Sequence, residues 1–226
     1  PINQEELIFP ASLQTIGVNA FDGGNAKYNK LIFKGNTKIG DNAFTQNEIG
    51  ELSFEGRVNI DRMGFRNTKI GKLDLGNTES IGREAFIDAS LTQDSLVFPE
   101  SVKTIGAAAF QSNKIKVNDL IIKGDTVLDR VAFKFVDLTN LKFEGAADIG
   151  INAFDNTNVK TIDFGEKTKI IRDSAFTNTK IDMDVLKIPS SVQSIEQSAF
   201  YSNTKKINKL VIGAKTIEVQ AFAGGT

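Results

Sequence analysis

The strongest constraint on this chain is a short pattern that recurs ten times along it. An isoleucine or leucine is followed five residues later by a phenylalanine, which we call the marker of that repeat. The residue before the marker is alanine in nine repeats and Gly64 in the tenth. The markers, which number turns 1 to 10, are Phe21, Phe44, Phe65, Phe86, Phe110, Phe133, Phe154, Phe176, Phe200 and Phe222. A period in the low twenties indicates a solenoid of stacked turns.

The spacing of the markers also repeats on a larger scale. Phe21 and Phe110 are 89 residues apart, and Phe110 and Phe200 are 90 residues apart. In one of every four turns a proline directly follows an apolar segment of three residues; these prolines are Pro10, Pro99 and Pro189. The sequence is therefore built from blocks of four turns.

Each turn also contains an apolar triplet in which the outer two residues are apolar and the middle one varies. The triplets are residues 7–9, 31–33, 52–54, 73–75, 96–98, 120–122, 141–143, 162–164, 186–188 and 210–212. Alternation with period two places the outer residues on one face of a strand and the middle residue on the other. We predict ten short parallel strands, one per turn. The segment that leads to the marker is too short for a stable α-helix, which leaves a 3₁₀ turn or a second narrow strand.

Aromatic residues occupy two positions of the repeat. Of the 17 phenylalanines, 16 lie at the marker or at the end of the triplet, and Phe135 is the exception. Turns stacked about 4.8 Å apart would place these rings in two internal ladders. Asparagines that follow several markers are expected to bond to turn backbone or to one another rather than to a ligand. They are Asn47, Asn67, Asn113, Asn156, Asn178 and Asn203.

Composition excludes most catalytic chemistry. The chain has no cysteine and no histidine, so it lacks disulfides, thiolate ligands and the commonest general base and metal ligand. Asp182 and Asp184 together fall short of the roughly six to eight oxygens that calcium takes. The formal net charge of −1 gives no electrostatic case for nucleic acid or an anionic membrane, and no apolar run is long enough to span a bilayer. We predict no enzyme activity, no cofactor and no metal site.

The candidate binding residues are the middle residues of the triplets, which face away from the core. The most informative are Ile32, Asp74, Val97, Ile121, Lys142, Asp163, Lys187 and Val211, and Ile8 and Ser53 complete the row. Exposed β-branched residues on a regular face can form a docking surface, but they can also be ordinary strand formers. Several of these strands follow loops two residues longer than the others, which could fold over the face.

The segments FPESVKTIGAAAFQSN (98–113) and IPSSVQSIEQSAFYSN (188–203) resemble the BspA-like leucine-rich repeat family. Members commonly carry cysteine three residues after the marker, where Asn47, Asn113 and Asn203 stand in this chain. The resemblance implies a mainly β, curved leucine-rich-repeat solenoid of about ten short turns with a parallel sheet on one face. It also implies an exported or surface-anchored protein that adheres to other cells or to host matrix.

We therefore expect residues 1–226 to form a single array, cut from a longer protein because both ends fall within a repeat. The predicted function is a non-catalytic recognition or adhesion module on the extracellular surface of the cell. Its partner would be a host or matrix protein or another cell-surface protein, with no nucleic acid and no direct membrane insertion. The alternative is a structural spacer, or stalk, that presents another domain.

Overall fold

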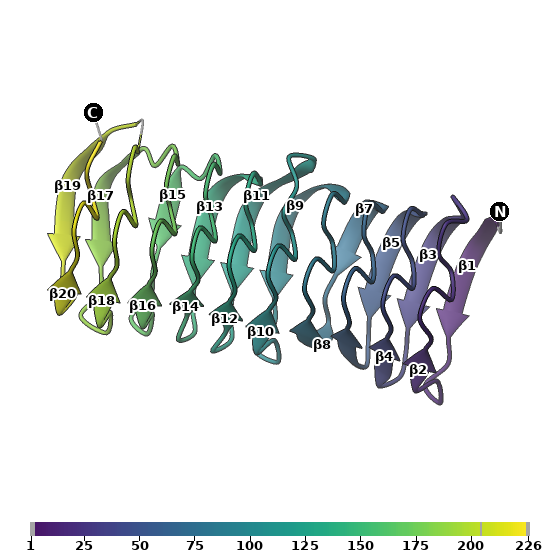
Figure 1. Cartoon of the computed structure of the whole chain (residues 1–226). Coiled ribbons are helices and arrows are strands. Elements are labelled where there is room, and N and C mark those ends of the chain that lie inside the picture. The colour runs from purple at the N-terminus through teal and green to yellow at the C-terminus, as the bar shows by residue number, and fades with distance from the viewer. Residues whose placement is uncertain (1–2, 204, 225–226) are drawn as a thin grey trace.

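The computed structural model describes residues 3–203 and 205–224 as an elongated stack of ten turns, with the two termini at opposite ends (Figure 1). Every strand pairing in the stack is parallel, and the described residues contain no helix. The predicted solenoid is therefore confirmed. Pro1, Ile2, Gly225 and Thr226, on which the expectation of cut ends partly depends, lie outside the described residues.

The triplets lie in ten broad strands, one per turn, as predicted. These are β1 (Asn3–Phe9), β3 (Lys27–Phe33), β5 (Glu48–Phe54), β7 (Lys69–Asp74), β9 (Ser90–Phe98), β11 (Ile115–Ile122), β13 (Asp137–Phe143), β15 (Thr161–Asp163), β17 (Met183–Ile188) and β19 (Ile207–Ile212). The first eight form one parallel sheet, and β17 and β19 form a separate pair. The broad sheet is thus divided, which the repeat pattern did not predict.

A second, ten-stranded sheet answers part of the alternative left open by the sequence. Narrow strands end at the isoleucine or leucine that precedes each marker by five residues, and the rest of the segment up to the marker forms a turn and not a strand. They are β2 (Thr15–Ile16), β4 (Thr37–Ile39), β6 (Arg57–Ile60), β8 (Asn77–Ile81), β10 (Thr104–Ile105), β12 (Val127–Leu128), β14 (Asp148–Ile149), β16 (Ile170–Ile171), β18 (Ser194–Ile195) and β20 (Thr216–Ile217).

The core between the two sheets is dominated by the marker rings. All ten markers stack in one column, with neighbouring ring centroids 4.8 to 5.4 Å apart and ring planes within 13° of parallel. Phenylalanines at the strand ends approach this column edge-on, as Phe98 does toward Phe110 at 5.3 Å and 84°. The predicted aromatic interior is therefore confirmed. The second ladder is interrupted where Leu75, Ile122 and Ile188 replace phenylalanine.

The segment around each marker forms a turn with a left-handed residue. In all ten turns the residue two places before the marker has φ between 51° and 59°; these residues are Asn19, Asn42, Met63, Glu84, Ala108, Val131, Asn152, Ser174, Ser198 and Gln220. The backbone N–H of this residue and that of the marker donate to carbonyls of the following turn. Phe44, for example, donates to Gly64 at 2.8 Å and Phe65 to Ala85 at 2.8 Å. The residue before each marker is small because it packs against isoleucine side chains: a Cβ added at Gly64 would lie 2.8 Å from the side chain of Ile60 and 3.7 Å from that of Ile39.

Val131 is the one β-branched residue among the ten left-handed positions, and it should lower the stability of the array. The left-handed conformation costs an L-residue roughly 1–2 kcal/mol, and asparagine tolerates it better than valine does. We expect Val131→Asn to raise the free energy of unfolding by about 1 kcal/mol, measured by urea denaturation. The matched reverse change, Asn152→Val, should lower it by a similar amount. Destabilisation by Val131→Asn would contradict this account of the turn.

Only part of the predicted asparagine ladder exists. Asn47 donates to the Phe21 carbonyl at 2.9 Å and accepts from the Ala26 N–H at 3.0 Å. Asn203 accepts from the Ile181 N–H at 2.8 Å, which is the bond equivalent to that with Ala26, but it donates to the Ile181 carbonyl at 3.1 Å. The other four asparagines do not complete the ladder: Asn113 is exposed, and Asn67, Asn156 and Asn178 are left-handed turn residues. Hydroxyl groups replace the amide in several turns, and those of Thr68, Thr157 and Thr179 bond to backbone carbonyls. The position is structural, as expected, but it is not a continuous stack of amides.

In turns 2 to 9 a buried position two or three residues before the narrow-strand isoleucine or leucine alternates between threonine and an aliphatic residue. Its occupants are Thr37, Val58, Thr78, Val102, Thr126, Ala147, Thr168 and Val192. The hydroxyl group of Thr126 bonds to the carbonyls of Val102 at 2.9 Å and Gly124 at 3.2 Å. That of Thr78 is fully buried and finds no partner among the described residues.

Thr78→Val is expected to raise the free energy of unfolding by about 1 kcal/mol, because it removes an unpaired buried hydroxyl with little change of shape. The control is Thr126→Val, which should lower stability by about 1 kcal/mol because its hydroxyl is bonded. Urea denaturation of the two variants measures both effects. Equal effects of the two substitutions would contradict the prediction.

Once per four-turn block the pairing between neighbouring broad strands is reduced, between β7 and β9, or absent, between β15 and β17; we call these places the first and second divisions of the broad sheet. At the first division only two residue pairs join β7 to β9. Beyond them the Gln93 side chain replaces the backbone pairing: it accepts from the Leu73 N–H at 2.9 Å and donates to the Leu73 carbonyl at 3.3 Å. One block later, at the second division, Met183 occupies the position equivalent to Gln93, and Ile162 the position equivalent to Leu73. A thioether cannot make the pair of bonds that the Gln93 amide makes. No pairing joins β15 to β17 within the described ranges. In β9, one of the strands expected to follow a longer loop, the two extra residues lie within the strand and form no loop over the face.

Candidate functional site

The outward face of the broad strands carries the predicted binding residues. Their triplet neighbours are buried from β3 to β17, while the middle residues are half-buried or exposed. Strand register aligns Ile8, Ile32, Ser53 and Asp74 in one row, Val97, Ile121, Lys142 and Asp163 in a second, and Lys187 with Val211 in a third. The rows are separated by the two divisions of the sheet. The orientation predicted from alternation is confirmed; a binding role for these residues is still a prediction.

Within these rows the apolar residues lie in adjacent pairs. Ile8 is aligned with Ile32, and Val97 with Ile121. Ile8 is 42% exposed, and the other three are half-buried by their neighbours on the sheet. A groove of about 340 Å³, lined by Asp74 and Val97 among others, lies at the first division and separates the two apolar pairs.

The charged residues of the row already have partners within the chain. The carboxylate of Asp74 accepts from the Gly76 N–H at 3.0 Å, and that of Asp163 accepts from the Gly165 N–H at 2.9 Å. Both glycines have positive φ, so these two aspartates stabilise the turn that ends the strand.

The lysines of the row are also paired. Lys142 lies 2.9 Å from Glu144 and Lys187 lies 2.7 Å from Glu166. Hydrogen bonding to these carboxylates raises the pKa of both lysines above its ordinary value. All four side chains are well exposed, so the pairs contribute little to folding.

A ladder of ion pairs crosses the strands beside the first row. Glu48 lies between Lys27 at 3.2 Å and Lys69 at 2.8 Å, and Lys72 bonds to Glu51 at 2.7 Å. The hydrogen bond from Lys69, followed by that from Lys27, lowers the pKa of Glu48; the bond from Lys72 lowers that of Glu51. These charged side chains beside the first row are thus paired with one another.

These shifts give the direction in which pH changes stability. Carboxylates with a lowered pKa stabilise the fold above their ordinary pKa of about 4.3, and that contribution is lost as pH falls through the lower folded value. Lysines with a raised pKa contribute below about pH 10.4 and lose that contribution above it. Because the chain has no histidine, the melting temperature should be constant between about pH 6 and 8 and should fall below about pH 4. Thermal melts followed by circular dichroism test this, and a transition centred near pH 6.5 would contradict it.

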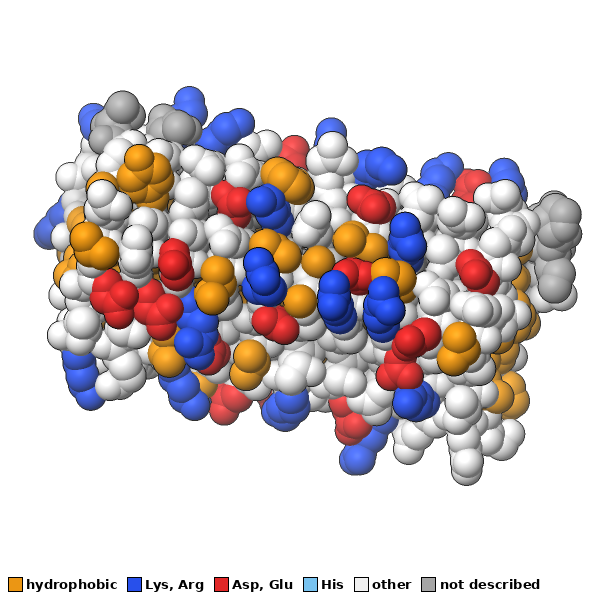
Figure 2. All heavy atoms as spheres, viewed as in Figure 1, with side chains coloured by type: hydrophobic (Ala, Val, Ile, Leu, Met, Phe, Trp, Pro, Cys, Tyr) orange, Lys and Arg blue, Asp and Glu red, His pale blue; other side chains and the backbone are white. Residues whose placement is uncertain are grey.

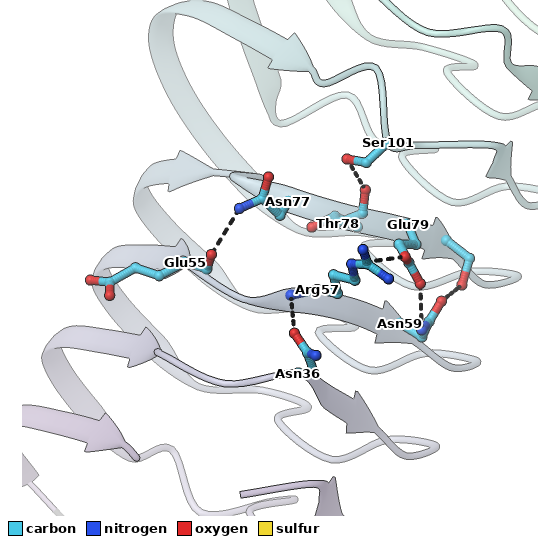
Figure 3. A network of polar contacts seen from close by, with 9 residues as sticks. Asn36, Glu55, Arg57, Asn59, Asn77, Thr78, Glu79 and Ser101 are labelled. Carbon is cyan, nitrogen blue, oxygen red and sulfur yellow. Dashed lines mark hydrogen bonds and ion pairs between the residues drawn. The ribbon is translucent and has the colours of Figure 1, made fainter. Parts of the chain in front are cut away.

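A groove of about 810 Å³ lies at the corner between the broad and narrow strands (Figure 3). Its polar groups bond mainly to one another across successive turns. Asn36 accepts from the Arg57 N–H at 3.0 Å, Asn77 donates to the Glu55 carbonyl at 2.8 Å, and Arg57 lies 3.7 Å from Glu79. These contacts couple the turns and offer no pair of acid and base groups for catalysis.

Two further kinds of functional site were sought in the rest of the described chain: a metal site and a membrane-spanning helix. Among residues 3–203 and 205–224, no three carboxylates gather closely enough to hold a metal ion. No helix in that part of the chain is long and apolar enough to cross a membrane.

The opposite surface carries residues that the sequence reasoning missed. We define a turn segment as the residues from four before to two after each marker, and the turn face as the surface that these segments form. Cationic and apolar side chains gather over the middle of the array in Figure 2. Exposed residues of this face include Phe135, 42% exposed, and Ile151, 44% exposed. The distribution of cations could have revealed it, because five of the six arginines lie in turn segments but only one of the 21 lysines, Lys134, does.

The fold defines a repeat protein of stacked parallel turns, with aligned apolar and charged side chains on the outward face of its broad strands. The model of the BspA type leucine-rich repeat region matches six copies over residues 2–116 and 126–226, so the chain belongs to this family. The crystal structure of the pneumococcal vaccine antigen PcpA is similar, with a TM-score of 0.55 and 17% identity over 98% of this chain. The chain spans 58% of the length of that antigen. No curated protein matches the chain.

Proposed function

We propose that this chain is a non-catalytic module of an exported cell-surface protein and that it binds another protein across the outward face of the broad strands. The observation that carries the proposal is the register of the two apolar pairs, Ile8 with Ile32 and Val97 with Ile121. Exposed apolar side chains in a fixed geometry supply binding free energy with little loss of conformational freedom. The ion pairs around them form a polar rim.

The family and the similar structure support the surface location. A vaccine antigen has to be accessible to antibodies, and the PcpA chain shares this architecture. The partner class that fits is a host or matrix protein or another cell-surface protein, recognised through adhesion. The face offers no net positive charge, so nucleic acid is not a partner.

The test uses purified matrix and cell-surface proteins immobilised for surface plasmon resonance. We expect at least one to bind the chain, and Ile32→Asp/Ile121→Asp to weaken that binding at least about tenfold. The control is Val18→Asp on the turn face, which is 65% exposed and should leave binding unchanged.

The second candidate function is a spacer that presents another domain, favoured by the elongated shape and the continuous core (Figure 1). A spacer predicts that no surface substitution changes the capture of any protein. Binding that both variants leave intact would therefore overturn the recognition proposal and favour the spacer.

A further inference from the structure

The second division of the broad sheet holds an oxidisable side chain beside backbone that lacks its usual partner. Met183 is one of two methionines in the chain, which has no cysteine. Its side chain is half-buried at the start of β17, so a small oxidant can reach the sulfur. Within the described ranges, no pairing joins β15 to β17 and no group of turn 9 bonds to the Ile162 N–H.

The surroundings of Met183 match those of Gln93 at the first division. Gln93 pairs with Val117 of the following turn. Met183 pairs in the same register with Ile207. One residue further on, an aspartate accepts from an asparagine of the next turn, at 3.2 Å beside Gln93 and at 2.7 Å beside Met183. The preceding turn is alike too, since its broad strand ends in both blocks at an aspartate bonded to a left-handed glycine. The two positions therefore have equivalent geometry.

Oxidation makes the methionine side chain similar to that of glutamine. The sulfur Sδ stands where glutamine has Cδ, so the oxygen of a sulfoxide takes the place of Oε1. A thioether is a weak acceptor, whereas the sulfoxide group is polar and its oxygen accepts hydrogen bonds. At the first division Oε1 of Gln93 accepts from the Leu73 N–H at 2.9 Å. The equivalent donor at the second division is the Ile162 N–H.

We infer that Met183 is an oxidation site whose sulfoxide closes the second division by accepting a hydrogen bond from the Ile162 N–H. The oxidant is hydrogen peroxide. A lone pair of Sδ attacks one peroxide oxygen, the O–O bond breaks and an S=O bond forms. The proton of that oxygen passes to the departing hydroxide, which leaves as water, and the sulfur loses the two electrons that the peroxide gains. Methionine sulfoxide reductase reverses the step.

The expected effect has the opposite sign to that of ordinary methionine oxidation. A sulfoxide in a purely apolar setting disrupts packing. At Met183 the new oxygen instead gains a backbone donor, while the rest of the side chain stays packed against the core. The result is a firmer link between turns 8 and 9. This link does not depend on which protein the broad-strand face binds.

The test treats two single-methionine chains with hydrogen peroxide. Met63→Leu leaves Met183 as the one methionine, and Met183→Leu leaves Met63. Mass spectrometry follows sulfoxide formation. In Met63→Leu we expect oxidation to slow hydrogen exchange at the Ile162 amide about fivefold and to raise the melting temperature by about 2 °C. Methionine sulfoxide reductase should return both values to those of the untreated chain.

Met183→Leu is the matched control, because the sulfur of Met63 lies in a turn segment, 3.9 Å from the Arg66 guanidinium. Its oxidation should leave the Ile162 amide unchanged. Met183→Gln, without peroxide, should reproduce the slower exchange.

Three results would overturn the proposal. The first is a Met183 that stays unoxidised under conditions that oxidise Met63 completely. The second is a Met183 sulfoxide that lowers the melting temperature, and the third is one that leaves exchange at the Ile162 amide unchanged. If Met183→Gln slows this exchange and the sulfoxide does not, the geometry of the division is correct but Met183 is not the site that closes it on oxidation.

Discussion

Phe110→Ala is expected to lower the free energy of unfolding by roughly 3–5 kcal/mol, as measured by urea denaturation. The ring is 1% exposed and stacks between Phe86 at 4.8 Å and Phe133 at 5.4 Å, with Phe98 against it edge-on. Its removal leaves a cavity in the middle of the column. Adjacent turns cannot collapse into that cavity, because backbone hydrogen bonds on both sides fix their spacing.

The matched control for this prediction is Phe135→Ala, which removes the same side chain at an exposed position in the next turn. It should change the free energy of unfolding by no more than about 0.5 kcal/mol. A similar loss of stability in both variants would show that the column of rings is not the source of the effect.

Gln93→Met should lower the free energy of unfolding by about 2 kcal/mol, because the Leu73 N–H and carbonyl lose their partners at the first division of the sheet. The substituted residue is the one that already occupies the equivalent place in the next block, so a similar volume fits there. Hydrogen exchange at the Leu73 amide should become faster.

The reciprocal change, Met183→Gln, should raise stability by about 1 kcal/mol by bridging to the backbone of Ile162. The same exchange experiment checks it, through slower exchange of the Ile162 amide. If Gln93→Met is neutral while the Leu73 amide keeps its protection, the bridging role assigned to Gln93 is wrong.

Much of this fold could be predicted because each turn repeats a strict hydrophobic pattern. The isoleucine or leucine, the small residue and the marker specify one inward face, and the triplet specifies a second. The left-handed residue before each marker was not predictable, because residues as different as Asn152, Glu84 and Val131 occupy it. Its conformation is imposed by hydrogen bonds to the neighbouring turn rather than by local preference.

The divisions of the broad sheet were not predictable either, since they depend on how neighbouring strands align. The first is spanned by the Gln93 side chain and the second is not, although the two positions look alike in the triplet pattern. The change from Gln93 to Met183 distinguishes them in the sequence, but its effect is visible only in how β9 and β17 pair with their neighbours.

For the candidate site, alternation predicted which side chains face outward but not what they contact. Asp74 and Asp163 each stand two residues before a glycine, a spacing typical of a carboxylate that caps a turn, and this could have been read from the sequence. The ion pairs of Lys142 and Lys187 depend on side-chain geometry, and the sequence alone does not provide it.

Hydrogen exchange followed by NMR at the marker amides tests most directly whether the ten turns form one continuous stack. From Phe21 to Phe200 each marker N–H donates to the next turn, whereas that of Phe222 has no partner among the described residues. We predict strong and comparable protection of the markers in turns 2 to 9 and fast exchange at Phe222. Protection that falls into separate groups, with an unprotected marker such as Phe86 or Phe110 between them, would contradict a single array.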